Sequence, residues 1–130
     1  MNKPCAVGDT FTLVRACDVY RPIYYAAASG DFNPIHIDSK VGAEAGLGGA
    51  ILQGLCTLGW AVDAFIGYLG DPGRVSGIKV RFSRPVAPLD VVTFTGTVIS
   101  IENGTVVAQI EAKNQRDQDI LKGAVVEGRL

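Results

Sequence analysis

The chain has 130 residues, of which 48% are hydrophobic and 19% are charged, with 16 glycines and a formal net charge of −1. This composition predicts one packed domain over residues 1–130, burying roughly two thirds of the surface of the unfolded chain, and excludes a disordered or low-complexity segment. The chain contains no basic run, which argues against nucleic acid and acidic membrane surfaces as partners.

The amino-terminal residues and the cysteines indicate the compartment. Residues 1–4 lack the apolar stretch of a secretory signal, and no apolar run in the sequence is long enough to cross a membrane. The three cysteines, Cys5, Cys17 and Cys56, are odd in number and form no CxxC pair. We therefore expect reduced thiols in a cytoplasmic protein.

The first part of the chain predicts a strand followed by a helix. Residues 9–14 are typical of a short strand. Residues 23–28 form the body of the helix, which begins either with Asp18 as its N-cap or at Pro22, because proline is tolerated only near the first turn. Gly30 is placed to end the helix in a left-handed conformation.

The next segment predicts an irregular turn and a short helix. The pair Asn33-Pro34 marks a tight turn, because proline disfavours helical geometry in the residue before it. Residues 39–45 are expected to form a helical turn, and the small residues 46–50 are expected to form a loop.

Residues 54–69 give the strongest helical pattern, with apolar side chains around nearly the whole circumference. Such a helix is too short for a membrane span, so other structure must enclose it. The remainder predicts strands at 78–82, 91–101, 105–114 and from 120 onward, with a hairpin turn at Asn103-Gly104. The expected fold class is α+β, with a curled antiparallel sheet around one buried helix.

The most informative functional feature is the only histidine, His36, five residues after Asp31 in a segment interrupted by glycine and proline. An imidazole with a neighbouring carboxylate is a common pair for proton transfer near neutral pH. The alternative is structural, with Asp31 capping a turn and His36 satisfied by a hydrogen bond. The restricted loop backbone favours the catalytic interpretation.

The segment around this pair resembles the MaoC-like (R)-specific enoyl-thioester hydratases and 3-hydroxyacyl dehydratases, which have the hot-dog fold. The resemblance covers most of the chain and rests on Tyr25-x-x-x-Ser29-Gly30-Asp31-x-Asn33-Pro34-Ile35-His36-x-Asp38, on residues 51–59 and on residues 80–86.

The resemblance implies roles for individual residues. Asp31 and His36 match the catalytic acid–base pair, and the Gly54 amide matches the group that binds the thioester oxygen. Asn33 matches a position that fixes the loop and helps to orient the acid. Asn33, Gln53 and Leu55 are candidates for binding or orienting the substrate. The implied reaction is reversible hydration of trans-2-enoyl thioesters to (R)-3-hydroxyacyl thioesters in fatty acid metabolism, carried by coenzyme A or acyl carrier protein, without a cofactor.

The sequence departs from the family pattern at two positions. Gln53 stands where many members have histidine, and Leu89 stands where a glycine is frequent before Asp90. We expect the chemistry to survive the first change, because His36 supplies the imidazole. The second is expected to be structural only.

Several other side chains have both a functional and a structural interpretation. Asp38 is a second acid or a loop cap, Cys56 is a nucleophile or a buried hydrophobe, and Asp63 needs a polar partner if buried. A metal site formed by Asp31, His36 and Asp38 is disfavoured, since the chain has one imidazole and no thiol cluster. Five basic residues could meet the phosphates of a thioester carrier or simply face solvent: Lys79, Arg81, Arg84, Lys113 and Lys122.

Two other functions remain open from the sequence. A hot-dog acyl thioesterase would keep the fold and use an acid to activate water at the carbonyl, although the paired motif favours hydration. A subunit of a heteromeric dehydratase would need a second chain for activity. The high apolar fraction and the resemblance both predict a homodimer or a higher homo-oligomer.

Overall fold

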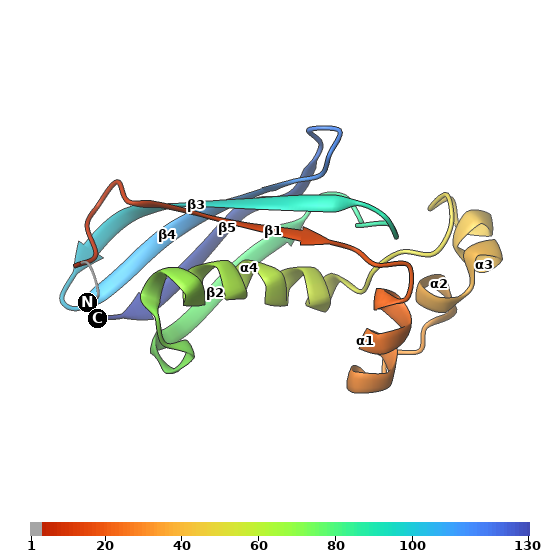
Figure 1. Cartoon of the computed structure of the whole chain (residues 1–130), viewed down its shortest axis with the longest axis horizontal. Helices are drawn as coiled ribbons and strands as arrows, with labels where there is room; N and C mark the ends of the chain where they lie inside the picture. Colours follow the sequence, from red (N-terminus) through yellow and green to blue (C-terminus); the bar gives the residue numbers. More distant parts are fainter. Residues whose placement is uncertain (1–3) are drawn as a thin grey trace.

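The computed structural model describes residues 4–130, and the expectation about a secretory signal therefore falls largely on residues outside the described part. Five antiparallel strands form one curved sheet in the order β1-β3-β4-β5-β2, with a long helix lying against it (Figure 1). The strands are β1 (Thr10–Ala16), β2 (Val75–Phe82), β3 (Val91–Glu102), β4 (Thr105–Lys113) and β5 (Asp119–Arg129).

The helices are α1 (Arg21–Ser29), α2 (Pro34–Ile37), α3 (Ser39–Glu44) and α4 (Gly54–Leu69), with a 3-10 turn at Pro72–Arg74. Helices α1 to α3 gather beyond the amino-terminal end of α4, away from most of the sheet (Figure 1). Every strand and both longer helices predicted from the sequence are present. The α+β hot-dog architecture is confirmed.

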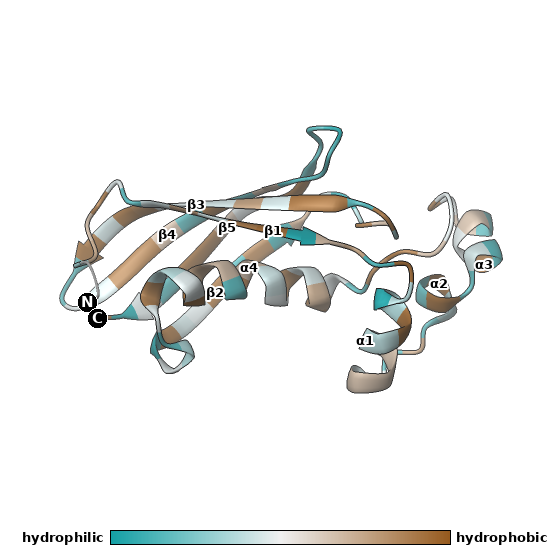
Figure 2. Cartoon of the chain, in the orientation of Figure 1, coloured by the Kyte–Doolittle hydropathy of each residue, from teal (hydrophilic) through white to brown (hydrophobic). Residues whose placement is uncertain are grey.

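Buried and exposed side chains alternate along the strands, and the buried ones form the core. In β3 the side chains of Val92, Phe94 and Val98 are almost fully buried, while intervening residues are exposed, so one face of the sheet packs on α4. Brown and paler residues alternate along the strands in Figure 2. Phe65 of α4 is fully buried and joins this core.

The expectation that other structure encloses α4 on all sides is wrong for the single chain. One side of the helix packs against the sheet through Trp60, Ala61 and Phe65, but Leu55 is 64% exposed on the other side. A sheet of one chain covers only one face of a helix, so the circumferential apolar pattern exceeds what this chain alone buries.

Two local expectations are corrected. Asp18 does not cap α1: the N-cap position is Tyr20, and the Asp18 carboxylate accepts a hydrogen bond from the Tyr20 N–H instead (2.7 Å). Pro22 lies in the first turn, as its missing N–H allows. Asn33-Pro34 does not form an irregular turn, because Pro34 starts the one-turn helix α2 and the Asn33 side chain caps it.

Cys5, Cys17 and Cys56 form no disulfide in the structure. Among the helices described over residues 4–130, none is long and apolar enough to cross a membrane.

Candidate active site

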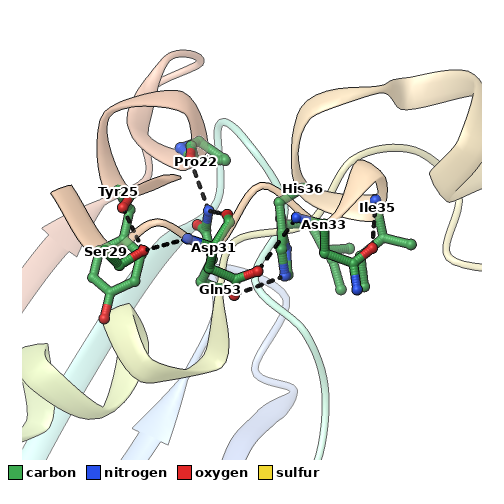
Figure 3. A network of polar contacts seen from close by, with 9 residues as sticks. Pro22, Tyr25, Ser29, Asp31, Asn33, Ile35, His36 and Gln53 are labelled. Carbon is green, nitrogen blue, oxygen red and sulfur yellow. Dashed lines mark hydrogen bonds and ion pairs between the residues drawn. The ribbon is translucent and has the colours of Figure 1, made fainter. Parts of the chain in front are cut away.

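Short-range hydrogen bonds shape the segment that carries Asp31. Gly30 ends α1 at φ 78°, which turns the chain sharply, and the Asp31 N–H then donates to Ser29 Oγ (3.1 Å). Asp31 Oδ1 accepts from the Asn33 N–H (3.3 Å), and Asn33 Oδ1 accepts from the Ile35 N–H (3.2 Å). One carboxylate oxygen of Asp31 is thus engaged within the turn, and the other points toward His36 (Figure 3).

His36 is held by a backbone partner that the sequence did not reveal. Its Nδ1 lies 2.8 Å from the carbonyl oxygen of Ile51. A carbonyl oxygen only accepts hydrogen bonds, so Nδ1 carries the proton and Nε2 of the neutral ring presents a lone pair. The ring is 8% exposed, so its orientation is also fixed by packing.

The lone pair of His36 faces the carboxylate across a gap. His36 Nε2 and Asp31 Oδ2 are 3.6 Å apart, and the Asp31 side chain is 47% exposed whereas the His36 ring is almost covered (Figure 3). This separation exceeds a normal hydrogen bond, and with a neutral ring both atoms are acceptors. The pair is suited to bind one donor molecule, such as water, through both of its hydrogens.

Helix α4 brings a backbone hydrogen-bond donor to a cavity that His36 also lines. A cavity of about 290 Å³ is lined by His36 and Gly54 together with Leu47, Ile51, Leu52, Thr57 and residues 82–86. Gly54 is the first residue of α4, so its N–H has no acceptor within the helix and lies at the positive end of the helix dipole. The cavity therefore combines a base with a potential oxyanion donor.

The reason for glycine at position 54 is visible in the packing. A Cβ added at Gly54 would lie 3.2 Å from the Phe82 ring, closer than ordinary contact. Phe82 comes from the end of edge strand β2, and its ring is about half exposed. Sequence reasoning assigned Phe82 only to an alternating strand. Its position over Gly54 depends on tertiary packing that no local pattern encodes.

The other candidate residues divide into those near the site and those apart from it. Asn33 caps α2 beside the pair, and Gln53 lies beneath the segment that carries Asp31, with its Nε2 donating to the Pro22 carbonyl (2.8 Å). The Leu55 side chain is exposed and is not one of the residues of the 4–130 region that line the cavity with His36.

The remaining alternatives have structural explanations. Asp38 caps α3, with Oδ1 accepting from the N–H groups of Lys40 and Val41, as the loop-cap interpretation predicts. Burial raises the pKa of the Cys56 thiol, the opposite of an activated nucleophile. Asp63 is exposed and lies 3.9 Å from Arg15.

The basic residues considered for phosphate binding differ in their distance from the cavity. Lys113 Nζ lies within 3.7 Å of carboxylates of Glu111, Asp117 and Asp119, remote from the cavity, and these raise its pKa. Arg84, by contrast, lines the cavity with His36. No cluster of metal-ligating side chains is found within residues 4–130.

The chain is similar to several known proteins. It is 38% identical over 99 residues to the peroxisomal enoyl-CoA hydratase 2 of Arabidopsis thaliana, which covers 75% of this chain and 31% of the relative. It is 44% identical over 89 residues to the peroxisomal multifunctional enzyme type 2 of Mus musculus, covering 67% of this chain and 11% of the relative. The chain thus spans less than a third of the length of these curated relatives.

The fold matches a solved hydratase structure. The unliganded R-hydratase PhaJ1 from Pseudomonas aeruginosa superposes with a TM-score of 0.85 at 24% identity, covering 96% of this chain and 82% of that chain. The family described as the MaoC like domain matches residues 20–120, a span that includes the Asp31–His36 pair, Gly54 and strands β2 to β4. The chain belongs to the MaoC-like dehydratase family.

Proposed function

We propose that this chain catalyses the reversible hydration of trans-2-enoyl thioesters to (R)-3-hydroxyacyl thioesters. The observation that carries this proposal is the facing pair of acceptors, His36 Nε2 and Asp31 Oδ2, 3.6 Å apart beside a cavity that His36 shares with Gly54. The family membership and the hydratase names of the relatives support the same reaction class.

In the proposed mechanism, Asp31 and His36 hold a water molecule by accepting its two hydrogens. The water oxygen attacks the β-carbon of the enoyl group while one O–H bond breaks and its proton passes to this pair. The carbon–carbon π electrons move toward the thioester and form an enolate. The pair then returns a proton to the α-carbon, so the net reaction adds one water. The reverse sequence is dehydration.

The Gly54 N–H stabilises the enolate in this mechanism. A hydrogen bond from the first turn of α4 to the thioester oxygen strengthens as negative charge develops there. Glycine permits close approach of the substrate to the backbone, and its lack of a side chain also accommodates the Phe82 ring. The water and the substrate account for every proton and electron pair of the step, so its balance requires no oxidant, reductant or other co-reactant.

Delivery of water from one side would make the hydration stereospecific, and we propose the (R) configuration of the product from the resemblance to the (R)-specific hydratases. Asp31 and His36 belong to a single segment, whereas Gly54 begins α4, so the water and the oxyanion donor approach the alkene from fixed directions. We propose a coenzyme A or acyl carrier protein thioester as the substrate, with Arg84 at the cavity as a candidate for the carrier's phosphates. The free thiols favour a reducing compartment such as the cytoplasm.

We also propose a homodimer as the minimum assembly. Large apolar side chains are exposed near the candidate site, among them Tyr20, Tyr24, Phe32, Leu55 and Phe82. Exposed apolar groups in this number are typical of a surface that binds a partner. Light scattering of the purified protein should give twice the chain mass or more, and an active monomer would contradict the proposal.

The function is tested with purified protein and a series of enoyl thioesters of increasing chain length. Hydration should remove the absorbance of the conjugated double bond without releasing free thiol, and chiral chromatography should show the (R) product. Thiol release from saturated acyl thioesters would instead indicate a thioesterase. Absence of both reactions from a folded dimer would overturn the proposed activity, and activity that requires a second, related chain would indicate a heteromeric enzyme.

A further inference from the structure

Gln53 has an unusual environment for an uncharged polar side chain. It is 1% exposed and occupies the N-cap position of α4, where its carbonyl accepts from the N–H groups of Cys56 (3.0 Å) and Thr57 (3.4 Å). Its side chain turns away from the helix and reaches the segment before the candidate site (Figure 3). Gln53 therefore connects the start of α4 with a second region of the chain.

The side-chain amide donates in two directions. Nε2 lies 2.8 Å from the Pro22 carbonyl in the first turn of α1 and 3.5 Å from the Asp31 carbonyl. Both partners are acceptors, so the amide must present its NH₂ group to them, and the alternative orientation would place oxygen against oxygen.

This orientation leaves the amide oxygen without a partner. Gln53 Oε1 is buried, and no hydrogen bond to it exists among residues 4–130. An unsatisfied buried acceptor costs stability, and an apolar side chain of similar length would avoid that cost. The Pro22 carbonyl also lies in a helix, where regular hydrogen bonding uses it. The NH₂ group is thus poorly explained by folding stability alone.

We propose that Gln53 is a positioning residue that fixes the backbone of Asp31 relative to the Gly54 amide. The other hydrogen bonds of the Asp31 turn are local and exposed, from the Asp31 N–H to Ser29 and from the Asn33 N–H to Asp31. Gln53 adds a part-buried hydrogen bond (3.5 Å) that joins the Asp31 carbonyl of this turn to the residue immediately before Gly54. The inference rests on the proposed hydration, because it concerns the alignment of the base pair with the oxyanion donor.

The decisive variant is Gln53→Met, which keeps the length of the side chain and removes both the donor and the unpaired oxygen. We expect the unfolding midpoint to change little and kcat for enoyl thioester hydration to fall about 10- to 100-fold, because a small misplacement of a catalytic group is costly. KM should stay within about twofold of the wild-type value, since Gln53 does not line the cavity. Gln53→Leu serves the same purpose if the methionine variant does not fold.

Rescue by a donor separates positioning from packing. Gln53→His offers a ring N–H in place of the amide, so kcat should recover to within about threefold of the wild-type value. A low kcat in both the histidine and the methionine variants would show that any change at this position harms the enzyme, and it would overturn the proposed link.

Asn114→Ala is the matched control for loss of a buried amide. Asn114 is also buried, and its Nδ2 donates to Gln118 Oε1 (3.0 Å) in the turn between β4 and β5, far along the chain from the site. This variant should lower the unfolding midpoint and leave kcat of the folded protein unchanged. A parallel loss of kcat in Asn114→Ala would assign the Gln53 effect to general destabilisation.

Hydrogen exchange provides a readout that needs no activity. The amides of residues 31–35 should exchange faster in Gln53→Met than in the wild type, while those of β4 should not change. An inactive wild-type protein would refute the proposed hydration but would still allow this comparison. Unchanged exchange, or an active Gln53→Met variant with wild-type kcat, would refute the positioning role alone.

Discussion

The two ends of helix α4 both open onto cavities, and the larger one lies at the end without the candidate site. At the amino-terminal end, Gly54 and His36 line a cavity of about 290 Å³. At the carboxyl-terminal end, Tyr68 and part of strand β1 line a cavity of about 800 Å³. Cavity volume therefore does not select the end of α4 at which we place the reaction.

Electrostatics distinguishes them. The N–H groups of the first turn give the Gly54 end a partial positive charge, and the carbonyl groups of the last turn give the other end a partial negative charge. The carboxylates of Asp9 and Asp63 also line the larger cavity, and among residues 4–130 Arg74 is the cationic residue in that lining. We therefore expect a thioester oxygen that gains negative charge to be stabilised better at the Gly54 end. The polarity of the helix and its neighbours, rather than space, selects the end at which we place the reaction.

The largest effect is expected from Asp31→Asn, which nearly preserves shape and removes the negative charge beside His36. Since the carboxamide no longer takes up the proton of water, kcat/KM for hydration should fall by about 10²- to 10⁴-fold. His36→Ala should lie in the same range. Steady-state assays on purified variants, with circular dichroism to check the fold, measure this effect.

Asp38→Asn is the matched control for this prediction, because it makes the same chemical change seven residues along the chain. Asp38 caps α3, and asparagine is also a good N-cap, so both stability and activity should remain near the wild-type values. A loss in Asp38→Asn equal to that in Asp31→Asn would contradict the assignment of the catalytic acid, as would an active Asp31→Asn variant.

A smaller effect is expected from Gly54→Ala, which tests the oxyanion donor at the same end of α4. The new methyl group would lie 3.2 Å from the Phe82 ring, so the ring must move and the approach of the thioester to the Gly54 N–H is obstructed. We expect a loss of about 10- to 100-fold in kcat/KM. Adding Phe82→Leu should relieve the contact with the new methyl group but restore only part of the activity, and full recovery would assign the loss to the ring alone.

Much of the fold could be predicted because local chemistry and tertiary structure agree. The predicted bounds of α4 match the structure, and Asn103 and Gly104 adopt positive φ values of 52° and 77° in the predicted hairpin turn. The start of α1 was less predictable. The Asp18 carboxylate makes a local turn with the Tyr20 N–H, which competes with capping the helix.

The candidate site was predictable as a set of residues but not as a geometry. The spacing of Asp31 and His36 suggested a pair, yet the partner that sets the ring tautomer, the carbonyl of Ile51, lies 15 residues after His36. The sequence also did not reveal the backbone conformation at Leu89, where we expect the departure from glycine to be structural only. The structure places Leu89 at φ 75° with its side chain 74% exposed, a conformation that explains the glycine frequent there.

The smallest effect is expected from Tyr68→Phe at the other end of α4. The Tyr68 hydroxyl donates to Asp9 Oδ2 (2.7 Å) and its ring stacks on Phe11, so removing the hydroxyl should cost about 1 kcal/mol of unfolding free energy and leave kcat unchanged. Denaturant titration and the hydration assay measure both quantities. A change in kcat comparable to that of Gly54→Ala would contradict the division of roles between the two ends.

The pH dependence of this variant adds a sharper test of the same end. Burial, with help from Cys5 and Asp9, raises the pKa of Tyr68 above its ordinary value of 10.0. The folded state therefore keeps the phenol proton at a pH where the unfolded state releases it, so the stabilisation is complete below about pH 10 and is lost as the pH rises further. The stability difference between the wild type and Tyr68→Phe should be constant from pH 7 to about 9 and should shrink above about pH 10. A difference that stays constant above about pH 10 would mean that the hydroxyl ionises equally in the folded and unfolded states, and a difference that grows would mean that the folded state favours the phenolate. Either result would contradict the raised pKa of Tyr68.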